Sequence, residues 1–199
     1  MRALNLLAAA PIALIAGLAV PAQAQSLTAT TPMQVTGNVP QICAMQRGQI
    51  QPGSALNVVG LDGDTLRIAQ FVDPATLSVK AASATVRFEA VCNFAHTVRV
   101  ESANNGLWQR DGRITQAPAG FAFAVPYTAN VSWGPVTNQF NADAKTRRIA
   151  QQSFNVDTAV AGDLNLRIEI AEGASNVEVD APVVAGTYSD TVRIFLEPR

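Results

Sequence analysis

Apolar and polar residues alternate with a period of two along most of this chain, and apolar residues seldom recur at the three-and-four spacing of a helix. Residues 164–170, LNLRIEI, are the clearest case, with Leu or Ile at every second position and Asn165, Arg167 and Glu169 between them. Such a strand has one dry face and one wet face. The pattern therefore predicts an all-β fold, most simply an antiparallel sandwich.

Turn-forming Gly, Pro, Asn and Asp residues separate further segments of this kind. The other expected strands are residues 56–61, 65–72, 84–92, 97–102, 121–127, 131–133 and 191–196. Residues 135–155 do not follow the alternation, and they predict either a long loop or one short surface helix over 142–152. In the last strand, Val192, Ile194 and Leu196 share one face, and no later strand follows that could pair with its edge.

The N-terminal residues predict a signal peptide over 1–24, because Arg2 precedes a long apolar run that ends at the small residues Ala22 and Ala24. The alternative, a retained membrane anchor, is disfavoured by Pro11 and by other interruptions of the run. We therefore expect export to the periplasm. The remainder of the chain is of a length that fits one domain.

A second alternating run extends from residue 27 to residue 39, which is long for one strand of a sandwich. Pro32 lacks a backbone N–H and belongs at a break or an edge. The run therefore predicts two units, a free extension over residues 25–32 and a first strand over Met33–Val39 that opens a domain of residues 33–199.

The net charge and the cysteine content limit the expected partners and the expected state of the thiols. The expected signal holds one of the 14 basic residues and none of the 15 acidic ones, which leaves a net charge of −2 and gives no reason to expect a nucleic acid partner. Cys43 and Cys92 are the only cysteines, and in an exported chain one disulfide is favoured over two free thiols.

The chain offers little for catalysis or for metal binding, so we expect neither an enzyme nor a cofactor. His96 is the only histidine, and it predicts an ordinary surface or turn residue rather than a catalytic base. One His and two paired Cys cannot form a zinc site. Asp62 and Asp64 lack the later Glu of a calcium loop, so a tight turn is favoured there.

Amphipathic aromatic residues could instead form a carbohydrate-binding platform. The candidates are Trp108, Tyr127, Trp133 and Tyr188. Because aromatic residues make up only 6% of the chain, we expect most of these four to pack in the core or against turns. Tyr188 directly precedes the last strand, where it is expected to fix the turn.

Three stretches resemble the spore coat U domain proteins and the related archaic chaperone–usher pilus subunits. They are residues 33–43 (MQVTGNVPQIC), 91–107 (VCNFAHTVRVESANNGL) and 184–198 (VAGTYSDTVRIFLEP). The resemblance implies an immunoglobulin-like sandwich that lacks its final strand. The groove left by that strand would be filled first by a periplasmic chaperone and then by the N-terminal extension of the next subunit.

By this resemblance, the extension over residues 25–32 is the donor strand and the last strand is the edge of the acceptor groove. The donor side chains would be Leu27, Ala29, Thr31 and Met33. The groove would be lined by Val192, Ile194 and Leu196. The expected function is a structural subunit of a surface pilus or coat fibre, with neighbouring subunits, a chaperone and an outer-membrane usher as partners. The alternative is a monomeric secreted sandwich that binds a glycan or a surface protein.

Overall fold

The computed structural model describes residues 30–110 and 118–199, so the expected signal peptide lies outside the described residues. The chain divides into two units, Met1–Asn38 and Val39–Arg199. Within the first unit, residues 30–38 form no strand, and every one of them is exposed. The prediction of a first strand over Met33–Val39 is therefore wrong. Alternation gives these residues the propensity for a strand, but a strand also needs a neighbour to pair with.

Within residues 30–110 and 118–199 all regular structure is β, and no helix there could cross a membrane. The strands are β1 (Cys43–Met45), β2 (Gln49–Ile50), β3 (Val58–Asp62), β4 (Thr65–Ile68), β5 (Ala82–Cys92), β6 (His96–Ser102), β7 (Leu107–Gln109), β8 (Ala124–Val125), β9 (Tyr127–Trp133), β10 (Val136–Ala142), β11 (Ala150–Val156), β12 (Val160–Ile170), β13 (Tyr188–Ser189) and β14 (Val192–Pro198).

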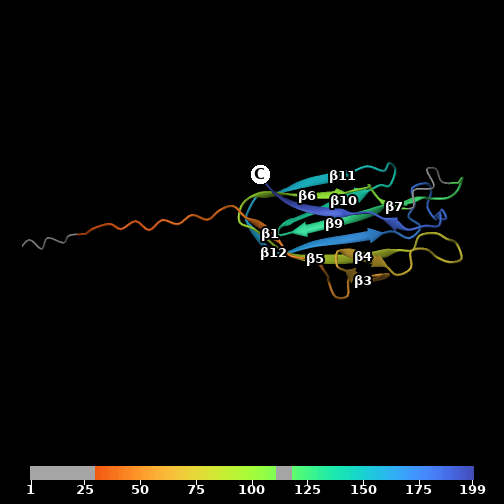
Figure 1. Cartoon of the computed structure of the whole chain (residues 1–199), viewed down its shortest axis with the longest axis horizontal. Helices are drawn as coiled ribbons and strands as arrows, with labels where there is room; N and C mark the ends of the chain where they lie inside the picture. Colours follow the sequence, from red (N-terminus) through yellow and green to blue (C-terminus); the bar gives the residue numbers. More distant parts are fainter. Residues whose placement is uncertain (1–29, 111–117) are drawn as a thin grey trace, which may run out of the picture. The chain divides into compact units, whose positions relative to one another are not determined.

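The domain Val39–Arg199 is built on two larger antiparallel sheets. The first has the order β1-β5-β12-β9-β10, with the short β2 also on β5, and the second has the order β11-β6-β14. Figure 1 shows β6 and β11 along one side of the domain and β5 and β12 along the other. Two small sheets, β13-β7-β8 and β3-β4, complete the domain.

One hydrophobic core joins the inner faces of the two larger sheets. Leu164 of β12 and Val131 and Trp133 of β9 pack in the same cluster as Val98 of β6 and Val156 of β11, and none of the five is more than 1% exposed. The sheets therefore face each other as in a β-sandwich. This confirms the predicted all-β fold, and residues 164–170, 84–92 and 97–102 lie within β12, β5 and β6.

Residues 135–155 form neither a long loop nor a helix. They form β10 and β11, and β10 pairs with β9 while β11 pairs with β6. The outward positions of these strands carry Gln, Asn, Thr and Ser, and only a few inward side chains, such as Phe140 and Phe154, are large and apolar. The alternation is therefore too weak for the sequence to reveal these strands.

The predicted disulfide is confirmed. Cys43 and Cys92 are bonded to each other across β1 and β5, where they are directly opposed residues, and no free cysteine remains. Because β1 has only three residues, this bond anchors the start of the domain more firmly than its few strand hydrogen bonds could.

Candidate functional site

The last strand, β14, is paired along one side only. Its seven residues lie antiparallel to β6, from Val192 opposite Ser102 to Pro198 opposite His96. Among residues 30–110 and 118–199, no strand is paired with the other side of β14. Its outward N–H and C=O groups therefore offer a row of hydrogen-bonding positions, the usual hazard of an edge strand.

The inward side chains of β14 are apolar and only half-buried. Val192, Ile194 and Leu196 pack against the edge of the core, but each keeps part of its surface open to solvent. An edge strand whose core-facing side chains are incompletely covered is the geometry expected where a further strand could be added. We call this side of β14, from Val192 to Leu196, the open edge.

On the opposite long side of the sandwich, β10 and β11 are also each paired along one side only, but the chain itself links these two strands. The chain passes from β10 in one sheet directly to β11 in the other, and the two strands lie next to each other. The Gln152 amide also donates a hydrogen bond to Asn138 Oδ1 across this junction at 2.6 Å. The two long sides of the sandwich therefore differ, and the open edge belongs to the side that β1 and β2 cover with only three and two residues.

Between β1 and β2 the chain makes a close approach to β5. The Gln46 N–H donates to Glu89 O, and Gln49 then pairs with Arg87, so the intervening residues bulge opposite Phe88. Gly48 lies over the core-facing side chains here, and a Cβ at this position would be 2.6 Å from Val86 Cγ1. Only glycine fits without movement of these side chains.

Replacing Gly48 with Ala should lower the free energy of unfolding by about 1–3 kcal/mol, the usual cost of overpacking. The matched control is Gly60→Ala, because no atom lies within 4 Å of a Cβ at Gly60 and its φ is ordinary. Without a clash, Gly→Ala is neutral or stabilises by about 0.4–1 kcal/mol. Urea unfolding of both variants measures the difference, and equal stability of the two would contradict a tight contact at Gly48.

A network of ion pairs ties β14 to β6 on the outer face of their sheet. Arg99 Nη2 is 2.6 Å from Glu197 and Arg99 Nη1 is 3.0 Å from Glu101, which also pairs with Arg193 at 3.1 Å. The Arg99 guanidinium lies 3.8 Å from the centre of the Phe195 ring. The hydrogen bond from Arg99 lowers the pKa of Glu197. The network ties Arg193 and Glu197 of β14 to β6 and so helps to hold the two strands in register.

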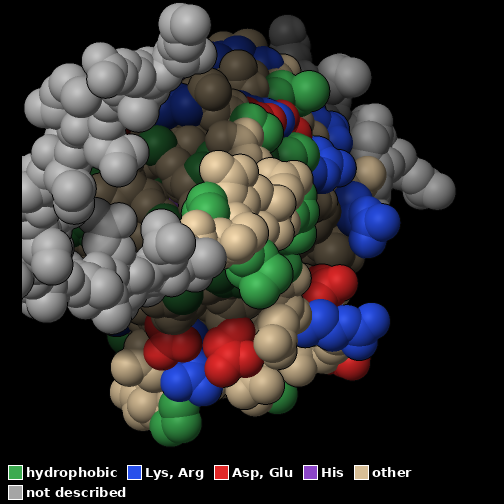
Figure 2. Space-filling view, turned by 90° about the vertical axis from the view of Figure 1, so that its left-hand side faces the viewer, with side chains coloured by type: hydrophobic (Ala, Val, Ile, Leu, Met, Phe, Trp, Pro, Cys, Tyr) green, Lys and Arg blue, Asp and Glu red, His purple; other side chains and the backbone are tan. Residues whose placement is uncertain are grey.

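Charges are mixed elsewhere on the surface as well. Figure 2 shows Lys and Arg next to Asp and Glu on the face that it draws.

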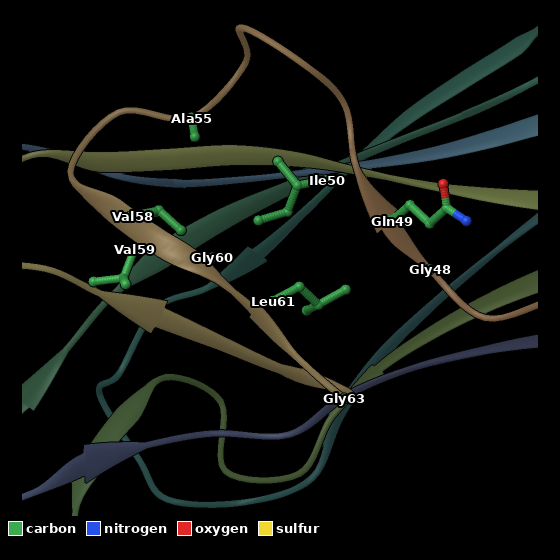
Figure 3. A pocket seen from close by; sticks show the side chains of 9 residues that line it. All are labelled: Gly48, Gln49, Ile50, Ala55, Val58, Val59, Gly60, Leu61 and Gly63. Carbon is green, nitrogen blue, oxygen red and sulfur yellow. The ribbon is translucent and has the colours of Figure 1, made fainter.

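A hollow lies between β2 and the β3–β4 hairpin, with a volume of about 480 Å³. Figure 3 shows Ile50 and Leu61 directed into it, and glycines contribute bare backbone. Its lining residues are Gly48, Gln49, Ile50, Ala55, Val58, Val59, Gly60, Leu61 and Gly63. None of these has an ionisable side chain, so the hollow holds no group for acid, base or nucleophilic catalysis.

The only histidine is a core residue, which corrects the expectation of a surface or turn position. His96 is fully buried, its ring lies 4.7 Å from that of Trp133, and its Nδ1 is 2.8 Å from Phe94 O. Strand β6 begins at His96, and Val98 and Val100 follow it on the inward face. The side chain therefore fills the end of the core and is closed to a substrate.

The four aromatic candidates do not form a platform. Trp108, Tyr127 and Trp133 are buried, and Tyr188 is half-buried with its ring 5.1 Å from that of Phe71. The Tyr188 hydroxyl donates to Val184 O at 2.7 Å, which closes the turn before β14. The expectation of core and turn-packing roles is confirmed.

Both tyrosines of the chain should resist ionisation at the ordinary phenol pKa of about 10. Burial and the nearby Asp190 carboxylate raise the pKa of Tyr127, and burial raises the pKa of Tyr188 to about 12. Because the folded pKa values are raised, the associated stability is complete below about pH 10 and is lost as the pH rises further. An ultraviolet titration of the folded protein should show phenolate only well above pH 10, and a step near pH 10 in folded protein would contradict this.

The acidic candidates for calcium form a turn. Asp62 ends β3, Gly63 has a positive φ of 60°, and Arg67 pairs with Asp62 at 3.3 Å on the exposed surface. In the part of the chain that the structure describes, no three His, Cys, Asp or Glu side chains come together as metal ligands would.

The predicted donor residues divide between the two parts of the N-terminal unit. Leu27 and Ala29 lie outside the described residues, and Thr31 and Met33 lie in the exposed stretch 30–38. Val35 is 92% exposed and Val39 is 79% exposed, so both are about as open to solvent as Met33, which is 86% exposed. The alternation over residues 33–39 is the sequence signal for these apolar residues, although it predicts a strand of the domain rather than a free extension.

A search against models of known protein families finds no match to this chain, and a search of curated proteins finds no match either.

Proposed function

We propose that this protein is an exported structural subunit of a surface fibre, assembled by exchange of strands between copies. The observation that carries the proposal is the pairing of β14 on one side only, with Val192, Ile194 and Leu196 half-buried along the open edge. A strand added there would satisfy free backbone groups and cover apolar side chains at the same time.

The proposed donor is the run from Thr31 to Val39. Its alternate positions Met33, Val35 and Val39 are apolar and strongly exposed, and no strand pairs with residues 30–38. Exposed apolar side chains on one face of an extended run, here with Gly37 between Val35 and Val39, are the counterpart that an apolar groove requires. This donor lies further along the chain than residues 25–32, and it includes Thr31 and Met33 of the original prediction.

The link between donor and domain favours exchange with another copy. Three residues, 40–42, separate Val39 from Cys43, and a chain of that length spans no more than about 11 Å. Asn93 fixes both ends of this link, because its Nδ2 donates to Pro40 O at 2.8 Å and its Oδ1 accepts from the Ile42 N–H at 2.8 Å. A flexible connection of the kind that would help a donor strand to insert into its own domain is therefore missing from residues 40–42.

Donor and open edge are different surfaces of one chain, so the contact between copies would be head-to-tail and would leave a donor and an open edge at the two ends of each assembly. Such a contact builds a fibre. The open edge of a newly exported subunit would need cover before assembly, which is the role we assign to a periplasmic chaperone, with an outer-membrane usher as the site of exchange. In this proposal the fold acts through backbone pairing and apolar burial rather than through catalysis.

The test is a denaturing gel of the mature chain from periplasmic and surface fractions, run with and without boiling. We expect a ladder of multimers that collapses on boiling and persists in unboiled samples under reductant, because both cysteines are paired within the subunit. A single monomer band in unboiled samples, with a cooperative thermal transition, would overturn strand exchange.

A further inference from the structure

Residue Asp190 lies two residues before β14 and accepts hydrogen bonds from three separate parts of the domain. Its carboxylate accepts the Tyr127 hydroxyl at 2.7 Å, the Asn104 N–H at 2.9 Å and the Thr191 N–H at 2.7 Å. It also accepts the Ser102 hydroxyl, the Asn104 side-chain amide at 3.2 Å and the Gly106 N–H at 3.4 Å. In the described ranges, no Lys or Arg pairs with this carboxylate.

The groups that donate these hydrogen bonds belong to β6, to the turn that follows β6 and to β9. Ser102 ends β6 and is opposite Val192 in the strand register, and Asn104 and Gly106 belong to the turn that follows. Tyr127 begins β9 in the other sheet and is only 5% exposed. One carboxylate therefore joins the start of β14 to both sheets of the sandwich.

The residues just before Asp190 fix the approach of the chain. Gly186 has a positive φ of 152°, and a Cβ there would be 2.5 Å from Gln109 Nε2. The Arg110 N–H donates to Thr187 O at 2.7 Å, and β13 pairs with β7. The segment 186–190 thus docks on β7 before the chain enters β14.

A strand that is paired on one side only has half the backbone restraint of an internal strand, and its ends open readily. At the far end of β14, the ion pair of Arg99 with Glu197 supplies restraint. At the near end, Arg193 pairs with Glu101, and the Asp190 carboxylate accepts hydrogen bonds from both sheets of the sandwich. Bonds to a charged group are stronger than neutral ones.

We propose that Asp190 is a positioning residue for the acceptor strand, holding β14 in register before any donor arrives. The open edge is then already shaped in the free subunit, and donor capture does not require the edge to order first. This inference rests on the proposed function, since it explains how the same open edge is held ready to accept a donor strand.

The test compares Asp190→Ala and Asp190→Asn in the full mature chain with two controls. Asp163→Asn removes a half-exposed carboxylate that pairs with Arg87, and Val131→Ala weakens the core away from β14. Hydrogen exchange is followed along the whole chain, and capture of a labelled synthetic peptide of residues 30–41 is timed on the same samples.

In Asp190→Ala, exchange at the β14 amides should rise at least about tenfold, and peptide capture should slow by a similar factor, since several charged hydrogen bonds are lost. Asp190→Asn, which keeps one acceptor oxygen, should lie between this variant and the wild type. Exchange in β12 should stay at the wild-type value. Asp163→Asn should change neither hydrogen exchange nor peptide capture. Val131→Ala should raise hydrogen exchange in all strands but slow capture less than Asp190→Ala does.

Unchanged β14 exchange in Asp190→Ala would overturn the inference, as would slowing of capture in Val131→Ala as large as in Asp190→Ala. If Asp190→Ala unfolds the whole domain, Tyr127→Phe and Ser102→Ala each remove one donor and decide the matter: a selective rise in β14 exchange supports the inference and a uniform rise overturns it. A wild type that captures no peptide would refute the proposed function, while the exchange measurement would still test Asp190.

Discussion

Replacing Val35 with Asp should abolish the boil-sensitive multimers of the exported chain, whereas replacing Thr36 with Asp should leave them at nearly wild-type yield. Val35 is 92% exposed, so the substitution has no packing to disturb within the subunit. In the groove it would forfeit about 1.5–3 kcal/mol of apolar burial and bring a carboxylate into partly apolar surroundings at a cost of several kcal/mol more. We expect assembly to fall by at least about 100-fold.

The control, Thr36→Asp, relies on the alternation of side chains between the two faces of a strand. Thr36 points to the opposite side of an extended strand from Val35, so its substitution adds the same charge on a face that stays in solvent. A third variant, Leu27→Asp, tests the more N-terminal donor that the sequence first predicted. Thermal unfolding of each monomer serves as a check that the domain itself is intact.

The measurement is densitometry of the unboiled ladder, normalised to total exported subunit. Equal loss of multimers in Val35→Asp and Thr36→Asp would mean that charge rather than a buried face is responsible. Loss in Leu27→Asp alone would return the donor to residues 25–32. Loss in none of the three would refute a donor in this part of the chain.

The strands that the sequence predicted well are those with a strong contrast between faces. Leu164, Leu166 and Ile170 of β12 are buried, and they alternate with the polar residues Asn165, Arg167 and Glu169. Both neighbours of β12, β5 and β9, are also long, so propensity and tertiary pairing agree. The last strand was found for the same reason, although its start lies at Val192.

The failures have two physical causes. Residues 33–39 have the alternation of a strand without a partner strand, because pairing is a property of tertiary structure that local pattern does not contain. Strands β10 and β11 have partners but little contrast between faces, and the buried Ala144, with a positive φ of 53°, makes the turn region between them hard to anticipate.

The residues of the candidate site also differ in how well the sequence predicts their positions. Val192, Ile194 and Leu196 could be placed on one face from a single segment. The Asp190 cluster could not be predicted, since its partners Ser102 and Tyr127 are 88 and 63 residues away in the chain. The alternation in β6 puts His96 on the same face as Val98 and Val100, but its contact with Trp133 exists only after the two sheets pack.

Removal of the disulfide should have the largest effect on the stability of the domain. The bond closes a loop with a sequence separation of 49, and in the chain-entropy model a loop of this size contributes about 4 kcal/mol. For a domain of this length, that loss corresponds to a fall in Tm of about 8–16 °C. The Cys43→Ser, Cys92→Ser double variant should show this fall, and reductant should reproduce it in the wild type while leaving the double variant unchanged.

Loss of the disulfide should also affect the open edge, because only three residues and this bond hold β1 to β5. Without the bond, β1 and the Asn93-fixed link at residues 40–42 would open more often than the central strands, and the side of the sandwich that contains β14 would lose its short cover. Hydrogen exchange of the double variant should therefore rise first at residues 42–45 and 192–196, ahead of β12. A uniform rise would mean that the bond stabilises the whole domain and has no special relation to the edge on which assembly is proposed to depend.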